Sequence, residues 1–329
     1  MSRTPSQAVS LRDVARAAET SVATVSRVLN RSGYVSAEVR KRVEKAAQGI
    51  GYVPNFSARH LKTGRSKAIG FMVSNMANPF LSAFFAAVEA RLQSEGFSVL
   101  VGSTFDQPQR EAQLLHLFEN RRLEGVFVSP SREDLPAAQD AFARCKLPLV
   151  VLDRETGFEA DAVCQDHRQG VATAVDYLVS LGHRRIALFG PNPAIRPGRE
   201  KLLGYRDGLR RAGLGYDEAL VCMLSSAIES SAAQMDAMLA LAAPPTALIA
   251  LGTRLRIPAQ LSVVGIGTDD AFALMDPPLT TLRFDIEGAA HAAAELMLER
   301  VEGRAPEARR SVHVPLALTI GASCAAPAR

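Results

Sequence analysis

Two short helices joined by a tight turn are predicted by residues 11–30, and this prediction constrains the rest of the fold most strongly. Apolar residues at helical spacing mark the first helix: Leu11, Val14, Ala15 and Ala18. Ser21 follows the break at residues 19–20 and is a natural N-cap for the second helix. The buried stripe of that helix consists of Val25, Val28 and Leu29. This pattern is typical of a helix-turn-helix, with an ordinary helical hairpin as the alternative.

A third helix and a distinctive downstream segment follow this pair. Ser36 is the expected N-cap of the third helix, whose core face consists of Val39, Val43, Ala46 and Ala47. Residues 51–64 read Gly-Tyr-Val-Pro-Asn-Phe-Ser-Ala-Arg-His-Leu-Lys-Thr-Gly. Four segments, in the same order along the chain, resemble the DNA-binding end of the lac/galactose repressor family of bacterial transcription regulators. They are residues 13–15, 22–30, 51–55 and 58–61. The resemblance continues, with one gap, to the end of the chain.

This resemblance implies a DNA-binding transcription regulator. The expected protein is a repressor that binds a pseudo-palindromic operator as a homodimer and is modulated by a small polar effector, sugar-like or a related metabolite. Two heads on a twofold axis would read the two half-sites. An operator-binding regulator with a lost or altered effector response is the alternative. A cytoplasmic ligand-binding protein or an enzyme is a weaker alternative.

The distribution of charge supports a nucleic-acid partner independently. Residues 1–67 carry 13 Lys+Arg against 4 Asp+Glu, a net charge of +9. The remaining residues carry 25 against 30, a net charge of −5, so the overall +4 conceals a basic head on an acidic body. Such an asymmetry is the electrostatic footprint of a duplex-binding module.

Length and cysteine usage indicate the cellular context. The 329 residues suffice for a small head and a two-lobed body. The cysteines are scattered without a Cys-x-x-Cys spacing, which predicts reduced thiols: Cys145, Cys164, Cys222 and Cys324. The first nine residues lack the apolar run of a signal peptide, and no segment has the length of uncharged apolar sequence that spans a bilayer. We therefore expect a cytoplasmic protein.

The resemblance assigns DNA contacts to the second helix and its surroundings. The residues that open this helix read base edges in the family, and here they are Val22 and Ala23. Arg27 is able to bind guanine bidentately, whereas the two apolar side chains offer contact to a thymine methyl. Thr24, Ser26 and Arg27 lie near these base-reading residues. The residues expected to contact phosphate oxygens are Ser21, Thr24, Asn30 and Ser36. For Thr24 and Ser26, capping or solvation is an equal alternative.

Residues 55–62 resemble the hinge helix of the family, which orders only on cognate DNA and lies in the minor groove. Leu61 matches the leucine that each subunit inserts into the central base step, and Arg59 supplies a nearby cation. Asn55 and Ala58 belong to the same DNA-binding set. The alternative is a plain linker leucine that packs on the head.

From residue 68 onward, short apolar strands alternate with helices, which predicts an α/β fold with a two-lobed, doubly wound parallel-sheet core. In the first lobe the expected strands are 69–73, 97–102, 125–129 and 149–152, and the expected helices are 79–95, 109–121 and 135–144. In the second lobe the expected helices are 166–181, 199–212 and 229–241, and the expected strands are 185–189, 221–224 and 247–251. The chain would cross back near 277–281, pack a helix at 287–301 on the first lobe, and return with a last strand at about 313–318.

The predicted domains follow from these patterns. They are a disordered arm at 1–9, a helix-turn-helix domain at 10–54, a hinge helix and linker at 55–67, and an effector-binding and dimerisation core at 68–329. The first lobe is expected at about 68–164 plus 286–310, and the second at about 165–285 plus 311–323. Two such lobes resemble the family core, which is similar to a periplasmic sugar-binding protein.

An effector pocket is expected between the lobes, because ligands of doubly wound sheets bind at the carboxyl ends of the strands. The resemblance places a stacking aromatic at Phe80, a ligand hydrogen bond at Asp166, and a clamping arginine at Arg199. The remaining candidates are Asn75, Ser129, Asp153 and Asp269. A strand-end carboxylate such as Asp153 often only caps the next turn, and Arg199 could be a surface residue at a helix start.

Three departures from the family pattern affect these expectations. Glu19-Thr20 stands where Gly-Val is commonest in the turn. Roughly a dozen residues, about the length of an average helix, are absent around residues 252–258, and crossovers between parallel strands normally need that many. Gly267-Thr268 stands where Asp-Asp is common, so Asp269 is an uncertain substitute. Effector binding is therefore the least secure part of the resemblance.

Motifs of catalysis are absent from the sequence. It contains no Gly-x-Ser-x-Gly elbow, no Walker loop and no His-Glu-x-x-His, and its six histidines lack ligand spacing. The run Gly265-Ile266-Gly267 follows a strand but lacks the third glycine of a dinucleotide fingerprint. We therefore expect no catalytic residue, no cofactor and no metal site.

Overall fold

The computed structural model describes residues 9–29, 33–52, 65–133, 136–224, 232–250, 261–268 and 276–327. The chain forms two compact units, Met1–Arg65 and Ser66–Arg329. We call the first unit the head and the second the body, and each is described by itself.

Within the described residues, the head consists of three helices around a small apolar core. Its helices are α1 (Leu11–Ala17), α2 (Val22–Leu29) and α3 (Ala37–Gly49). Their inward faces bury Val14, Val25, Val28 and Val43. Ser10 and Asp13 form a reciprocal capping box at the start of α1, and Ser36 caps α3 through the backbone N–H of Val39. These short helices are therefore held by packing and caps, because isolated helices of this length are marginal in water.

The first lobe of the body is built on a six-stranded sheet, sheet A. Its strands are β1 (Ala68–Val73), β2 (Ser98–Ser103), β3 (Gly125–Val128), β4 (Leu149–Leu152), β5 (Asp161–Gln165) and β11 (Ser311–Val314). They lie in the order β11-β5-β4-β3-β1-β2, and every pairing is parallel. The strand order reverses between β1 and β3, which is the point where doubly wound sheets bind ligands.

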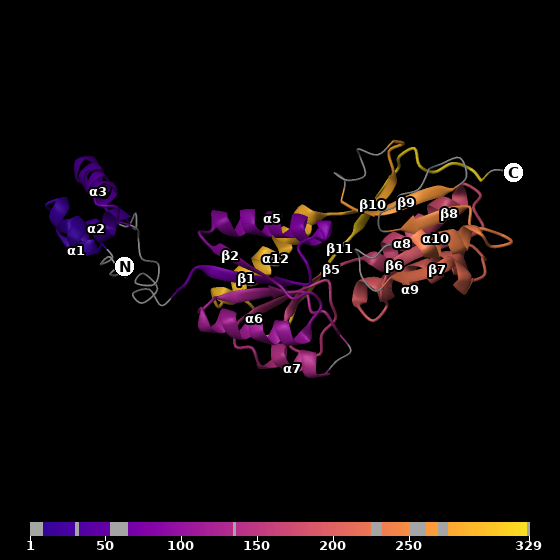
Figure 1. Ribbon diagram of the computed structural model, residues 1–329, viewed down its shortest axis with the longest axis horizontal. Coiled ribbons are helices and arrows are strands. Elements are labelled where there is room, and N and C mark those ends of the chain that lie inside the picture. The colour runs from indigo at the N-terminus through magenta and orange to yellow at the C-terminus, as the bar shows by residue number, and fades with distance from the viewer. Residues whose placement is uncertain are drawn as a thin grey trace, which may run out of the picture. The chain divides into compact units, whose positions relative to one another are not determined.

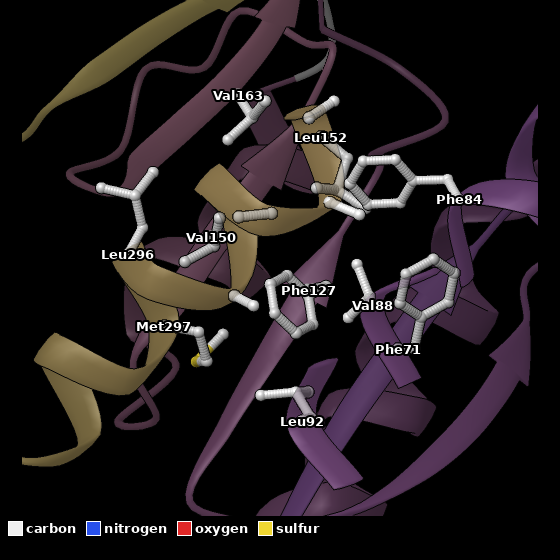
Figure 2. Packing of buried hydrophobic residues seen from close by; sticks show 14 of the residues in the cluster. Phe71, Phe84, Val88, Leu92, Phe127, Val150, Leu152, Val163, Leu296 and Met297 are labelled. Carbon is white, nitrogen blue, oxygen red and sulfur yellow. The ribbon is translucent and has the colours of Figure 1, made fainter. Parts of the chain in front are cut away.

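Helices cover both faces of sheet A (Figure 1). On one face lie α5 (Pro79–Ser94) and α12 (Ile286–Val301), and on the other α6 (Pro108–Asn120) and α7 (Pro136–Arg144). Figure 2 shows Phe71, Phe127 and Val150 of the sheet packed against Val88 of α5 and Met297 of α12. A helix from residue 286 onward thus completes a lobe that begins near residue 66.

The second lobe repeats this plan on sheet B. Its strands are β6 (Ile186–Pro191), β7 (Val221–Leu224), β8 (Ala247–Ala250), β9 (Ser262–Gly267), β10 (Thr280–Phe284) and β12 (Leu316–Thr319). They lie in the order β12-β10-β9-β8-β6-β7, with β12 antiparallel to β10 and the other pairings parallel. In the described part of this lobe, the helical segments are α8 (His167–Ser180), α9 (Arg196–Arg211), the 3₁₀ turn η1 (Glu218–Leu220) and α10 (Ala232–Leu239). These two sheets confirm the predicted doubly wound α/β core.

The strands differ from the sequence expectation at three places in the chain. β5 and β10 were not predicted, and the single strand expected at about 313–318 is two strands that belong to different sheets. β11 pairs with β5 of sheet A and β12 pairs with β10 of sheet B, with Pro315 between them. The chain therefore passes between the lobes after β5, after β10 and after β11. Within the described residues, no helix combines the length and apolarity that a membrane crossing requires.

Candidate functional site

The exposed face of α2 carries the residues expected to read DNA. Val22 is 41% exposed, and Ala23 and Arg27 are also exposed, whereas Val25 and Val28 are buried on the opposite side. The guanidinium of Arg27 has no ion-pair or hydrogen-bond partner among the described residues, so all of its donors are available. This face therefore presents two apolar groups and one free cation.

The hydroxyl groups around α2 are engaged within the head. Ser21 Oγ accepts from the backbone N–H of Thr24 at 3.1 Å and lies 2.9 Å from Thr24 Oγ1. Ser21 is thus the N-cap that the sequence predicts, and Thr24 is held by the same cap. Ser26 is half-buried and also has a partner, while Ser36 is exposed at the start of α3. A hydroxyl that accepts a backbone N–H in a cap can still donate its own proton to a phosphate oxygen.

Glu19 and Tyr34 are two conspicuous residues of the head. Glu19, in the turn between α1 and α2, has a φ of 47°, a left-handed conformation that favours glycine. Tyr34 is 93% exposed in the segment that leads from α2 toward α3. Its ring and hydroxyl are free to stack or to donate a hydrogen bond, and sequence reasoning did not single it out. An aromatic residue beside Gly33, ahead of an N-cap serine, was the available signal.

Five of the expected DNA-binding residues lie outside the described residues: Asn30, Asn55, Ala58, Arg59 and Leu61. The same holds for most of the hinge segment and for the arm up to residue 8.

In the body, polar side chains gather where the strands of sheet A end and face the beginning of α9. Asp153 follows β4 and is only 8% exposed. Its Oδ1 accepts from Arg196 Nη1 at 2.8 Å and from the backbone N–H of Gln165 at 3.2 Å, and its Oδ2 lies 2.7 Å from His167 Nε2. Arg196 Nη1 also donates to the carbonyl of Gln165 at 3.0 Å. One carboxylate of the first lobe thus binds the first residues of α8 and α9 in the second.

The protonation of this group follows from its burial and its partners. Burial alone raises the pKa of Asp153, but the adjoining His167 and the guanidinium of Arg196 lower it below its ordinary value. Burial lowers the pKa of His167 to about 4, although the negative charge of Asp153 acts to raise it. Near neutral pH His167 is therefore uncharged, donates from Nε2 to Asp153, and leaves Nδ1 as an acceptor. Asp153 and Arg196 then form the buried ion pair.

A second set of contacts joins the lobes beside the Asp153 cluster. Glu133, in the segment after β3, accepts from the backbone N–H of Arg196 at 2.9 Å and from Arg199 Nη2 at 3.1 Å. Arg199 Nη2 also donates to Glu155 at 2.5 Å. Arg199, the arginine expected to clamp the effector, is thus paired with carboxylates of the first lobe, while Arg196 is the arginine that lies buried at Asp153.

Close packing of α8 and α9 places these groups together. A Cβ added at Gly204 would lie 2.2 Å from the carbonyl oxygen of Arg168, so only glycine allows the two backbones to approach so closely. Gly208 similarly faces Val175. The start of α8 consequently lies against the middle of α9, with the two helices in close contact.

Lys201 is a buried cation of this region. It is 3% exposed, and no ion pair or hydrogen bond to its ammonium group occurs within the described residues. Burial lowers its pKa to about 8, with the charge of Asp153 opposing the shift. An ammonium held in this way lacks acceptors, and buried charges in proteins are normally paired.

Unsatisfied polar atoms cluster at the same place. Within the described chain, six buried side-chain atoms have no hydrogen-bond partner, and four of them lie at the carboxyl ends of the sheet A strands or just beyond them. These four are Glu111 Oε2, Ser131 Oγ, Gln165 Oε1 and His167 Nδ1. Buried polar groups nearly always find partners, so this concentration points to a site that receives a polar molecule.

The remaining expected effector residues occupy varied positions. Asn75 Oδ1 accepts from the backbone N–H of Ala77 at 2.9 Å, and Asp166 caps α8 through the backbone N–H of Gln169 at 3.1 Å. Phe80 packs on Phe284 of the second lobe, with ring centroids 4.8 Å apart. Ser129 is buried at the end of β3. Asp269 and the shortened stretch at 251–260 lie outside the described residues.

Sequence reasoning did not select Arg196, His167, Lys201 or Glu133. Pro197 was the available signal for the first of these, because proline favours the first turn of a helix and so places the start of α9 at Arg196. Asp-His at 166–167 was a weaker signal, a capping residue followed by a titratable one. Among the described residues, no group of His, Cys, Asp and Glu side chains has the arrangement of a metal site.

Comparison with known proteins finds a matching family model in each of the two units. Residues 10–55 match the family model of bacterial regulatory proteins, lacI family, and residues 175–324 match the model of a periplasmic binding protein-like domain. The chain is 31% identical over 312 residues to the HTH-type transcriptional repressor CytR of Escherichia coli (strain K12), an alignment that covers 90% of this chain and 91% of that protein.

Two solved structures of regulators match nearly the whole chain. The crystal structure of the Lac repressor dimer bound to operator and the anti-inducer ONPF matches with a TM-score of 0.82 and 27% identity, over 96% of this chain and 99% of that chain. The complex of the transcriptional regulator CelR with cellobiose matches with a TM-score of 0.69 and 27% identity, over 96% of this chain and 100% of that chain.

Proposed function

This chain belongs to the lacI family of bacterial regulatory proteins, and on that premise we propose that it is a transcriptional repressor that binds a pseudo-palindromic operator as a homodimer and responds to a small polar effector. The observation that carries the proposal is the exposed face of α2, where the unpaired Arg27 lies with Val22 and Ala23 on a basic three-helix head. A helix with this composition is suited to the major groove.

Each DNA-binding residue has a proposed role. Arg27 binds guanine, and Val22 and Ala23 contact thymine methyl groups. Ser21, Thr24, Ser26, Asn30 and Ser36 position the head on phosphates. Asn55, Ala58, Arg59 and Leu61 belong to a hinge segment within residues 55–67, and Leu61 inserts into the central base step of the operator. In this assignment residues 10–54 form the DNA-binding domain and residues 68–329 the core.

Dimerisation would use the exposed edge of sheet A. β2 is the edge strand, and its Leu100 and Val101 are 39% and 42% exposed. Leu117 of α6 is also an exposed apolar side chain. Exposed apolar side chains on an edge strand suit an association surface, and a twofold pair of heads matches a pseudo-palindrome.

The effector site lies between the lobes, around Asp153. The proposed ligand contacts are Asn75, Phe80, Ser129, Asp153, Asp166, Arg199 and Asp269. We add Arg196, His167 and Lys201 because they lie buried beside Asp153. All four unsatisfied atoms here can accept hydrogen bonds, and the Ser131 hydroxyl and Lys201 can donate them. A polyhydroxylated molecule supplies both donors and acceptors, as a sugar or a related metabolite does. Its binding would alter the closure of the lobes and so the spacing of the hinge segments, which couples effector and DNA. A regulator of chromosomal DNA with these properties works in the cytoplasm.

The proposal is tested by selecting bound sequences from a random duplex pool with the full-length protein. Enrichment of a pseudo-palindrome is expected, with a flexible pyrimidine–purine step at its centre. Salt-sensitive binding without enrichment would contradict the proposal. A thermal-shift screen of sugars and nucleosides then distinguishes an effector-controlled repressor from an operator-binding regulator that has lost its effector response. A ligand that raises Tm and changes operator affinity supports effector control, whereas specific DNA binding without any ligand response supports the lost-effector alternative.

A further inference from the structure

A group of free cations lies at the end of sheet A opposite the Asp153 cluster. They occupy the segments that lead into the strands: Arg121, Arg122, Arg144, Lys146 and Arg309. The first two precede β3, the next two precede β4, and Arg309 precedes β11. The lead-in segments of parallel strands share one edge of a sheet, so these five residues form a single surface, which we call the amino-end face.

Contacts between the segments confirm that this surface is continuous. Glu119, at the end of α6, accepts from the backbone N–H of Lys146 at 3.0 Å, which brings the segment with Arg121 beside the start of β4. Lys146 and Arg309 line one cavity of about 490 Å³ together with Arg300 and Asp161. Residues distant in the sequence therefore meet on one face.

The five cations have no partners of their own in the described part of the chain. All are exposed, and none forms an ion pair or a side-chain hydrogen bond there. The nearby carboxylates are mostly engaged elsewhere. Asp161 binds Arg300 and Arg310 at 2.8 and 2.7 Å, Glu299 binds Arg310, and Glu302 binds Arg304 at 2.5 Å. Glu119 and Glu124 accept the backbone N–H groups of Lys146 and Lys67, and Glu159 and Glu307 have no hydrogen-bond partner among the described residues. The five cations outnumber these four carboxylates, so the free charge of the face is positive, although the body as a whole is acidic.

The chain from the head enters the body at this same face. Lys67 accepts from the backbone N–H of Ser98 at 2.9 Å and donates its own backbone N–H to Glu124 at 2.5 Å, so it lies at the amino ends of β1 and β2. Twelve residues separate Tyr52, the last described residue of the head, from Arg65. A fully extended chain of that length spans at most about 45 Å. The length of this segment therefore sets an upper limit on the distance between the head and the amino-end face.

We propose that the amino-end face is an auxiliary DNA contact, which binds the phosphate backbone of the duplex flanking the operator. The inference rests on the proposed operator binding by the head. Unpaired arginine and lysine side chains bind phosphates without first breaking an ion pair, and each neutralised phosphate releases counterions. Such contacts add affinity and salt dependence but carry no sequence information.

The test compares a short operator duplex with one extended by about two helical turns on each side. The variant carries Arg121→Gln, Arg144→Gln, Lys146→Gln and Arg309→Gln in the full-length chain. Wild type is expected to bind the extended duplex more tightly and with a steeper dependence of log K on log salt. The variant should keep its affinity for the short duplex, lose the gain from the flanks, and show a salt slope lower by about 0.9 for each phosphate contact removed.

A matched control removes four cations from the second lobe, by Arg184→Gln, Arg206→Gln, Arg210→Gln and Arg211→Gln. This control has the same net charge and should retain the gain from the flanks. The inference would be overturned if the flanking duplex raised the affinity of wild type and of the amino-end variant equally. It would also be overturned if the control variant lost this gain in affinity as fully as the amino-end variant. Failure of wild type to prefer the operator at all would instead remove the proposed function, and this inference with it.

Discussion

Arg196 and Asp153 join the two lobes of the body through a buried ion pair, with Arg196 Nη1 2.8 Å from Asp153 Oδ1. Each residue is 8% exposed, and they are contributed by α9 of the second lobe and by the end of β4 in the first. The carboxylate is further held by His167 and by the backbone of Gln165. This cluster links the candidate effector site to the closure of the lobes.

Replacing Arg196 should strongly destabilise the body. Arg196→Met removes the guanidinium and leaves Asp153 as a buried carboxylate without its cation, a change that typically costs about 3–5 kcal/mol. Urea unfolding followed by circular dichroism measures the loss. The control is Arg211→Met, because the ion pair of Arg211 with Asp176 is about half exposed and should contribute less than about 1 kcal/mol. Similar losses in both variants would show that the Asp153 pair contributes no more than a surface pair.

The stability of the body should fall as the pH is lowered from about 6.5 toward 4. His167 has a folded-state pKa of about 4, below the value of about 6.5 in an unfolded chain, so the unfolded state takes up a proton first. Stability is fully present above about pH 6.5, and a shift of this size corresponds to a loss on the order of 3 kcal/mol by pH 4. His167→Gln keeps a donor toward Asp153 but does not titrate. Its unfolding free energy should depend less on pH in this window, whereas His116→Gln on the surface should behave as wild type.

Gly204 should not tolerate alanine. The added Cβ would lie 2.2 Å from the backbone carbonyl oxygen of Arg168, which cannot move without separating α8 from α9. Overpacking of this kind costs about 1–3 kcal/mol, and it should also displace Arg196 and Lys201 from the first lobe. Gly215→Ala, where no neighbour lies within 4 Å of the new Cβ, is the control for both stability and ligand response. Equal unfolding midpoints for the two variants would contradict this role of the close approach.

Glycine at position 19 should stabilise the head. Glu19 has a φ of 47°, and a left-handed residue with a side chain costs roughly 1–2 kcal/mol relative to glycine. Glu19→Gly should therefore slow hydrogen exchange of the α1 and α2 amides by about fivefold, the equivalent of about 1 kcal/mol. Glu19→Ala removes the same charge but keeps the Cβ. If it slowed exchange as much as glycine does, the effect would belong to charge and not to the backbone.

Much of the fold could be predicted from the sequence because its elements follow local patterns. The strands at residues 125 and 149 are short apolar runs, and α5 begins with an Asn-Pro cap, so their positions agree with expectation within a residue or two. β5 was missed because it begins with Asp161, whose charge is neutralised by Arg300 and Arg310 from far along the chain. Local patterns do not reveal such a partner. The division of residues 311–319 into two strands of different sheets likewise depends on tertiary contacts, which local patterns do not reveal.

The site was less predictable for the same reason. The sequence favoured Arg199 through its spacing from Gly204, whereas the structure buries Arg196 at Asp153 and pairs Arg199 with Glu133 and Glu155. Which of two arginines on one helix turn lies inward depends on where the facing lobe places its carboxylates. On the head, by contrast, the faces of α2 follow directly from helical periodicity, because buried and exposed residues alternate with the turn of the helix.

The most direct measurement of the central claim is the ratio of dissociation constants of the full-length protein for its selected operator and for a scrambled duplex of equal length, at one physiological salt concentration. The account predicts at least about a thousandfold preference for the operator. It also predicts that Arg27→Ala relaxes this preference by about 1–3 kcal/mol while the head remains folded. Equal affinity for the two duplexes in the wild-type protein would contradict sequence-specific operator binding.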